Sequence, residues 1–400
     1  MINFAAVLIY KQIMESLYIR DFGPIKEIFL EDIKPLTIII GQSGSGKSTL
    51  LKVLALTRWI YKMLNIRVYL QTAGVNESPF KFNIKRYLSD DGIIDYLHEN
   101  TLIIYRHDEA SFEIKGLKAE FRQTSQVSYE NLCLEKISFI TEKRNVLSDL
   151  LALSMKEKTA PFYLKELLSE YQTAIKYIKT LDLEAVGVRL EIKKVNGVEY
   201  SFISGHDAER VYSVRLEDAS SGIQSMAPLN LIVHYYAHFF NLVESFNKAV
   251  FRYLVEGDSL KDFHPAQNVG DIPRKRVDIH IEEPEVCLYP DNQIHLINQL
   301  VRECWNTDRN YDISLMITTH SPYLLNQLNL LFKAYDMGTD IDGAKISYEQ
   351  TAAYAIENGM LLNLKVKNAH LVNPEFLSAP VDHIYTQYDE LSKSARDENQ

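Results

Sequence analysis

A glycine-rich segment near the start of the chain has the composition of a phosphate-binding loop. It consists of Gly41, Gln42, Ser43, Gly44, Ser45, Gly46, Lys47, Ser48 and Thr49. Glycines let the backbone wrap around phosphates with successive N–H groups pointing at them, and a following helix adds the positive end of its dipole. Lys47 is expected to reach the β- and γ-phosphates, and the Ser48 hydroxyl to bind Mg²⁺. The segment therefore predicts a site for ATP and Mg²⁺.

Two adjacent acids end a second apolar segment. Residues 277–284 read VDIHIEEP, in which Ile279 and Ile281 alternate with polar residues as in a strand. Phosphoryl transfer to water needs one carboxylate on the metal and one that polarises the attacking water. We assign Glu282 to the metal and Glu283 to the water.

Two further segments could contact phosphate. Residues 315–322 read LMITTHSP, and a histidine at the end of such a strand, His320, can hydrogen-bond the γ-phosphate and sense its loss. Residues 219–229 read ASSGIQSMAPL, which places Ser220, Ser221 and Gly222 at the start of an apolar helix. That position is an anion-binding helix N-terminus, or an ordinary helix cap.

The elements that must position these residues can be read from the hydrophobic pattern. Residues 36–40 form a continuous apolar run, typical of a strand buried on both faces, and a helical period follows over 48–64. The order strand, glycine loop, helix is the context that a phosphate-binding loop requires. Further strands are expected at 17–22, 25–30, 102–105, 111–114, 119–122 and 137–140, with a helical stretch at 145–178. A hairpin over 188–203 would turn at Asn196-Gly197.

The helical stretch carries one apolar stripe at i, i+3, i+4, i+7 spacing. It favours packing against the core, with a partner-binding helix as the alternative reading. The stripe comprises Leu164, Leu167, Leu168, Tyr171, Ile175 and Ile178.

Composition limits the class of protein. The 400 residues are 46% hydrophobic and carry a net charge of −10, which allows a large core and argues against non-specific coating of nucleic acid. Cys133, Cys287 and Cys304 form no metal-ligand or disulfide pattern, which is typical of a reducing compartment. The apolar start is too short to span a bilayer, so we predict a cytoplasmic protein with no membrane association, starting at Met1 or Met14.

In their order along the chain, the four segments resemble those of ABC-class ATPase heads of the RecF, SMC/Rad50 and OLD-like group. GQSGSGKST is similar to their Walker A motif, IHIEEPEVCLYP to Walker B, ITTHSPYLL to the switch-histidine loop and SSGIQS to the signature loop. Glu282 stands where aspartate is commoner, and Tyr289 where histidine is frequent. The resemblance implies an α/β ABC-ATPase head with a mixed P-loop core sheet, an antiparallel β subdomain and a helical lobe.

The resemblance also implies how such a head works. Two copies, or a higher oligomer, would close head-to-tail around ATP, so that Ser220, Ser221 and Gly222 of one copy complete the site of the other. Lys47 and Glu283 would be catalytic, with Glu283 as the base, and His320 would sense the γ-phosphate. Residues 1–142 and 266–400 would form the core and 143–265 the lobe, with Glu142, Lys143 and Arg144 as couplers between lobe and nucleotide.

What the ATPase drives is suggested by what the chain lacks. Too few residues separate the glycine loop from the signature for a long coiled coil, and residues 321–400 are too few for an appended nuclease domain. The chain thus resembles stand-alone ATPase subunits of prokaryotic anti-phage systems of the Septu or PARIS type, which control a separately encoded effector, often a nuclease. The alternative is a RecF-like DNA-binding ATPase in repair or recombination. Phosphate contacts would then come from Lys81/Lys85/Arg86, Lys143/Arg144, Lys193/Lys194 and Arg274/Lys275/Arg276.

Overall fold

The apolar run before the glycine loop forms the central strand of a large sheet. In the computed structural model, β3 (Leu36–Gly41) is buried along its whole length and pairs in parallel with β13 (Asp312–Thr318) and β14 (Thr351–Glu357). The structure describes residues 15–75, 81–152, 161–205, 212–265 and 267–397. The choice between Met1 and Met14 as the start lies outside these residues.

Within the described residues, the sheet has eleven strands, and it consists of two parts. Five neighbouring strands around β3 are mutually parallel, and the strands from β6 to β2 form an antiparallel extension. The order across the sheet is β6 (Glu120–Ser125), β5 (Ala110–Lys115), β4 (Leu97–His107), β1 (Glu15–Phe22), β2 (Ile25–Leu30), β15 (Met360–Asn363), β14, β3, β13, β12 (Arg274–Glu282) and β7 (Cys133–Ile140).

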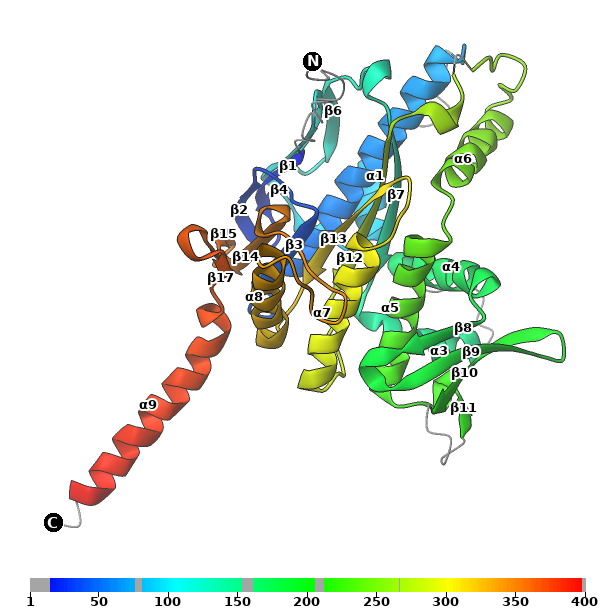
Figure 1. Ribbon diagram of the computed structural model, residues 1–400. Coiled ribbons are helices and arrows are strands. Elements are labelled where there is room, and N and C mark those ends of the chain that lie inside the picture. The colour runs from blue at the N-terminus through cyan, green and yellow to red at the C-terminus, as the bar shows by residue number, and fades with distance from the viewer. Residues whose placement is uncertain (1–14, 76–80, 153–160, 206–211, 266, 398–400) are drawn as a thin grey trace, which may run out of the picture.

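Helices cover both faces of the parallel strands. α1 (Lys47–Thr72) crosses one face, and α7 (Pro290–Trp305) and α8 (Pro322–Asp336) cover the other (Figure 1). The predicted helix after the glycine loop is confirmed, and it extends beyond residue 64. α2 (Ile84–Asp90) is a short surface helix before β4.

Between β7 and β12, the chain builds a lobe that contains a second sheet as well as helices. Its antiparallel strands are β8 (Thr180–Leu183), β9 (Val188–Val195), β10 (Val198–Gly205) and β11 (Ser213–Arg215). Its helical segments are η3 (Glu142–Val146), α3 (Leu147–Ala152), α4 (Phe162–Tyr177), α5 (Ser221–His238) and α6 (Leu242–Glu256). The predicted α/β architecture, with a mixed core sheet, an antiparallel part and a lobe, is confirmed.

The local patterns in the lobe are confirmed too. The predicted hairpin turns at Asn196 and Gly197, which both have positive φ (51° and 87°), as its turn requires. Every member of the apolar stripe on α4 and just after it is buried, so the core-packing reading holds. α6 packs against β7 and against Tyr69 of α1, so this last helix of the segment 143–265 covers the core.

Strand β12 departs from a simple alternation of buried and exposed residues, because Asp278 and His280 are buried as deeply as its isoleucines. Asp278 is fully buried and lies 3.2 Å from Arg58 Nη1 on α1. Arg58 Nε also donates to Glu15 Oε1 (2.7 Å), and Arg276 Nη1 lies 3.0 Å from Glu15 Oε2. Paired charges of opposite sign can occupy a buried face that isolated charges could not, so the strand is enclosed on both faces.

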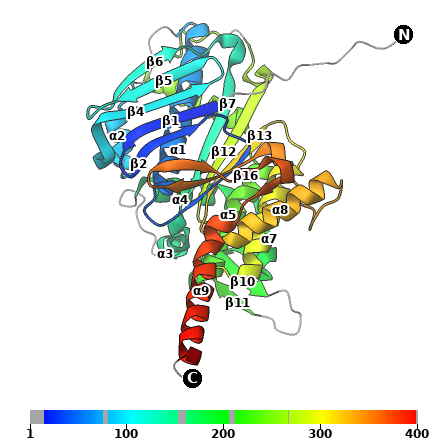
Figure 2. The same ribbon diagram turned by 90° about the vertical axis from the view of Figure 1, so that its left-hand side faces the viewer.

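At its C-terminal end, the chain extends away from the body as a helix. α9 (Glu375–Asp397) follows the short β16 (Lys365–Val366) and β17 (Leu371–Val372), and both views show it projecting outward (Figures 1 and 2). The helix continues to Asp397. Among the described residues, none of the helices is both long enough and apolar enough to cross a membrane.

Candidate nucleotide site

Three of the four segments singled out in the sequence meet at one edge of the sheet. β3, β13, β12 and β7 are neighbours and parallel, so their carboxyl ends lie at the same edge. Register fixes the positions: Glu282 pairs with Thr318, and Thr318 pairs with Ile39, two residues before the loop. The loop after β3, the acids after β12 and the histidine after β13 therefore meet.

The glycine loop has a backbone that side chains would disturb. Gly44 (φ 79°) and Gly46 (φ 106°) adopt left-handed conformations. A Cβ on Gly41 would lie 2.7 Å from the carbonyl oxygen of Ile356, which excludes a larger residue there. The two constraints explain why glycines occupy these positions.

The loop presents N–H groups that the protein itself does not use. The first helical bond of α1 runs from Leu50 N to Gly46 O (2.8 Å). Within the described part of the chain, the amides of Gly44, Gly46, Lys47, Ser48 and Thr49 have no acceptor. Ser45 Oγ and Thr318 Oγ1 are also buried without a hydrogen-bond partner among the described residues. A cradle of unused donors at a helix N-terminus fits the phosphates of ATP.

The Lys47 side chain lies within the same loop. Its Nζ donates to the carbonyl oxygens of Gly41 and Gln42, both at 3.0 Å, and its side chain is buried. Burial lowers the pKa of Lys47, while the carboxylates of Glu283 and Glu285 act in the opposite direction. The ammonium group is therefore held in the loop beside the acids at the end of β12.

Glu282 lies in a cluster of oxygens suited to a divalent cation. Its Oε2 accepts from Thr141 Oγ1 (3.1 Å), and both Glu142 and the Ser48 hydroxyl hydrogen-bond its carboxyl. Burial, and then the neighbouring Glu142, raise the pKa of Glu282 to about 8. Burial also disfavours the Glu142 anion, but the hydrogen bonds from Glu282 and Thr141 outweigh it and lower its pKa to about 2.

The hydrogen-bonded carboxyls of Glu142 and Glu282 and the nearby Ser48 hydroxyl are suitable ligands for Mg²⁺, since hard cations prefer carboxylate and hydroxyl oxygens. The predicted ligands Ser48 and Glu282 thus lie together. Glu142, expected only as a coupler, lies among them.

Glu283 and His320 face one another at the open side of the site. Glu283 Oε1 lies 3.4 Å from His320 Nε2, and both side chains are about one-third exposed. The hydrogen bond with His320 lowers the pKa of Glu283, which keeps the carboxylate ionised at neutral pH. The Glu283 amide donates to the Thr318 carbonyl (2.8 Å) and fixes the backbone in a left-handed conformation (φ 44°).

Glu285 lies in the candidate site, although no role was predicted for it from the sequence. Its Oε1 accepts from the His320 amide (2.6 Å) and from Thr319 Oγ1 (2.7 Å). The carboxyl is deeply buried, which raises its pKa. Glu285 therefore ties the loop after β12 to the loop that carries His320, and its position two residues after Glu283 was the available signal.

Arg144 connects the lobe to the same loop. Its guanidinium is fully buried and donates to the carbonyl oxygens of Glu282 (2.8 Å), Glu283 (2.7 Å), Pro284 (3.0 Å) and Ser225 on α5 (3.1 Å). Burial lowers its pKa to about 10, so it stays charged at neutral pH. The contacts support its expected coupling role.

Replacing Arg144 with alanine is expected to destabilise the protein by about 3 kcal/mol or more, because several buried carbonyls lose their donor at once. Urea unfolding followed by circular dichroism measures the change. Lys143→Ala, at the adjacent exposed position, is the matched control and should change the unfolding free energy by less than about 0.5 kcal/mol. Equal stability of the two variants would contradict the role of Arg144.

For two of the basic clusters, the prediction of an exposed patch that could contact DNA is wrong. Arg144 is enclosed as just described. Arg276 is buried with Glu15 and Asp278, and Arg274 pairs with Asp108. The remaining clusters are exposed but partly neutralised: Arg86 lies 3.8 Å from Asp90, and Lys193 lies 2.6 Å from Glu191.

The signature-like segment begins α5 but does not reach the glycine loop of its own chain. Ser220 and Ser221 are exposed, and among the described residues no hydrogen bond joins residues 220–222 to residues 41–48. A Cβ on Gly222 would meet the Cys287 carbonyl at 2.8 Å, so the segment packs against the loop after β12. Ser220 stands at the N-cap position of α5, as the helix-cap alternative expects, but no side chain makes a capping hydrogen bond there.

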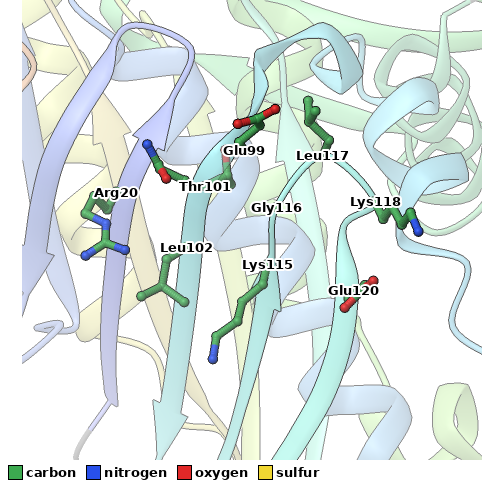
Figure 3. Close-up of a pocket in the computed structure, with 10 residues that line it drawn as sticks. Arg20, Glu99, Thr101, Leu102, Lys115, Gly116, Leu117, Lys118 and Glu120 are labelled. Atoms are coloured by element: carbon green, nitrogen blue, oxygen red, sulfur yellow. The ribbon is translucent and has the colours of Figure 1, made fainter.

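A separate hollow lies on the antiparallel part of the sheet. It has a volume of about 420 Å³, and Arg20, Thr101, Lys115 and Glu120 are among the residues that line it (Figure 3). None of the candidate site residues borders it, so it is distinct from the edge described above.

Comparison with known proteins finds matches among solved structures at low sequence identity. No family model matches the chain, and no curated protein matches it. The SMC head domain from Thermotoga maritima is 11% identical, with a TM-score of 0.36, over 88% of this chain and 99% of that one. The Smc head with an extended coiled coil, bound to the C-terminal domain of ScpA, from Pyrococcus furiosus is 10% identical, with a TM-score of 0.39, over 89% and 97%. The recombination mediator RecF is 11% identical, with a TM-score of 0.36, over 88% and 98%.

Proposed function

We propose that this chain binds ATP with Mg²⁺ and hydrolyses it. The observation that carries the proposal is the meeting, at one edge of the sheet, of unused loop amides, the Lys47 ammonium and the acids after β12. Phosphoryl transfer is catalysed by positioning and by charge stabilisation, and these groups supply both.

Each group has a distinct role in this proposal. Lys47 exchanges its two carbonyl contacts for the β- and γ-phosphates, which the amides of residues 44–49 hold in place. Ser48, Glu282 and Glu142 would hold Mg²⁺, which neutralises the charge that develops on the phosphates. Glu283 orients the attacking water and accepts its proton, and His320 donates to the γ-phosphate.

The present contact between Glu283 and His320 supports this division of roles. While the two side chains are paired at 3.4 Å, the carboxylate is engaged by the histidine. When His320 turns to a γ-phosphate, Glu283 is released to act on water. Glu285 holds the histidine loop in place through the His320 amide, so only the imidazole has to move.

We also propose that the site is completed by a second copy of the chain. Ser220 and Ser221 are exposed and, among the described residues, make no hydrogen bond to the glycine loop of their own chain. Tyr289, at the end of the loop after β12, is 70% exposed. A head-to-tail dimer would place these groups over the partner's glycine loop. Two ATPs would then lie between two chains.

Complementation between variants tests this shared site. Lys47→Ala and Ser221→Arg should each lack activity alone; Ser221 is exposed, so the arginine can be accommodated within its own fold. Mixing the two should restore activity, because a mixed dimer has one site with an intact loop and an intact opposing signature. Activity of the mixture at or below the sum of the separate variants would contradict the shared site.

The finer proposal is that nucleotide state controls a separately encoded effector, such as a nuclease or toxin in anti-phage defence. α9 supports it, since its apolar side chains at 381, 384, 385, 388 and 391 are each more than half exposed and lie on a helix that projects from the body (Figure 2). The RecF-like alternative is weakened by the burial of Arg144 and Arg276. Salt-dependent binding of duplex DNA by the purified chain alone would favour that alternative.

A further inference from the structure

A cluster of metal-binding side chains lies between α5 and α7, outside the nucleotide site. His234 and His238 are one turn apart on α5, and Glu303 lies on the last turn of α7. One ligand atom from each residue falls within 4.8 Å of the others. His238 Nε2 is 2.6 Å and His234 Nδ1 3.2 Å from Glu303 Oε2.

We propose that this cluster binds a divalent transition metal, with Zn²⁺ as the best fit. Two imidazole nitrogens and one carboxylate form a ligand set that favours Zn²⁺ over Mg²⁺ or Ca²⁺, which prefer oxygen alone. Three protein ligands leave a fourth position for water. The side chains of His234 and His238 are 24% and 35% exposed, so solvent and metal can reach them.

The surroundings hold the ligands in place. One turn earlier on both helices, Asn230 Nδ2 donates to Gln299 Oε1 (3.0 Å), which fixes the register of α5 against α7. The backbone carbonyl of Glu303 accepts from Thr307 Oγ1 (3.0 Å) and Arg309 Nη1 (3.1 Å), which secures the end of α7. A site whose ligands are already positioned loses little entropy when the metal binds.

The site would join two helices that begin at the nucleotide edge. α5 starts at the signature-like segment, and α7 follows the loop that carries Glu283. A metal at their far ends would hold the two helices together. The ligands are distinct from the residues proposed to bind ATP and Mg²⁺.

Isothermal titration calorimetry tests the proposal, with ZnCl₂ as the only titrant and excess Mg²⁺ in the buffer. The wild-type chain should bind Zn²⁺ at a site that is lost in the double variant His234→Ala/His238→Ala. Either single variant should weaken binding by more than about tenfold. His295→Ala is the matched control, since His295 lies on α7 at a more exposed position and pairs with Asp342.

The melting temperature is a second measurement that distinguishes loss of Zn²⁺ binding from a folding defect in the variants. Zn²⁺ should raise the melting temperature of the wild type and of His295→Ala, and not that of the double variant. His238→Cys should retain binding that His238→Ala loses, because a thiolate also coordinates Zn²⁺. Equal Zn²⁺ stoichiometry and affinity in the wild type and the double variant, or no binding by the wild type, would overturn the site.

Discussion

Replacing Lys47 with alanine is expected to abolish ATP binding at micromolar nucleotide. Lys47 is the one side-chain ammonium inside the loop, and hydrogen bonds to charged groups contribute about 1.5–3 kcal/mol each. Losing two such contacts to phosphate corresponds to an affinity reduced by about 100-fold or more. Binding of a fluorescent ATP analogue, measured by anisotropy, reports the change.

The appropriate control is Lys26→Ala, which removes an exposed lysine on β2. It should bind nucleotide like the wild type, which separates the role of Lys47 from the loss of one positive charge. Because Lys47 is bonded to the Gly41 and Gln42 carbonyls, circular dichroism should accompany the binding assay to confirm that the variant is folded. A folded Lys47→Ala protein with wild-type affinity would refute the reading of the glycine loop.

Replacing Glu283 with glutamine should leave ATP binding intact and slow hydrolysis by about 10²–10⁴-fold, the usual contribution of a general base. Glutamine has the same shape but cannot accept a proton at neutral pH. The bond from the residue 283 amide to the Thr318 carbonyl does not depend on the side chain, so the loop should keep its path. Phosphate release measures the rate.

The same variant should accumulate as a dimer when ATP and Mg²⁺ are present, because a closed pair that cannot hydrolyse cannot reopen. Analytical ultracentrifugation with and without nucleotide distinguishes the two states. Glu244→Gln, which removes an exposed carboxylate on α6, should behave as the wild type in both assays. Wild-type turnover by Glu283→Gln would show that another group is the base.

The sequence predicted the elements that frame the site because each has a strong local pattern. The continuous apolar run of β3, the glycines after it and the helical period of α1 agree with one another. The acids after β12 and the histidine after β13 were assigned to one site through the resemblance to ABC-ATPase heads. In the structure they lie together because parallel strands end at a common edge. The roles given to Ser48, Glu282, Glu283 and His320 remain predictions that the geometry supports.

What could not be predicted depends on contacts between distant parts of the chain. Arg144 lies in a run of charged residues that resembles a surface, yet its partners are carbonyl oxygens at 225 and 282–284, which have no side-chain pattern. Asp278 alternates with apolar residues in the sequence of β12, and nothing in that pattern reveals that it is buried beside Arg58 of α1. Glu142 lies beside Glu282, a proposed Mg²⁺ ligand, only because β7 pairs with β12.

The left-handed backbone of Glu283 has a consequence for how this protein can change over time. A residue with a Cβ is typically less stable by about 1–2 kcal/mol in that conformation, and glycine would adopt it freely. Mutation of Glu283 to glycine would thus raise the folding stability but remove the carboxylate. Under the proposed mechanism, a Glu283→Gly change would therefore exchange turnover for thermostability.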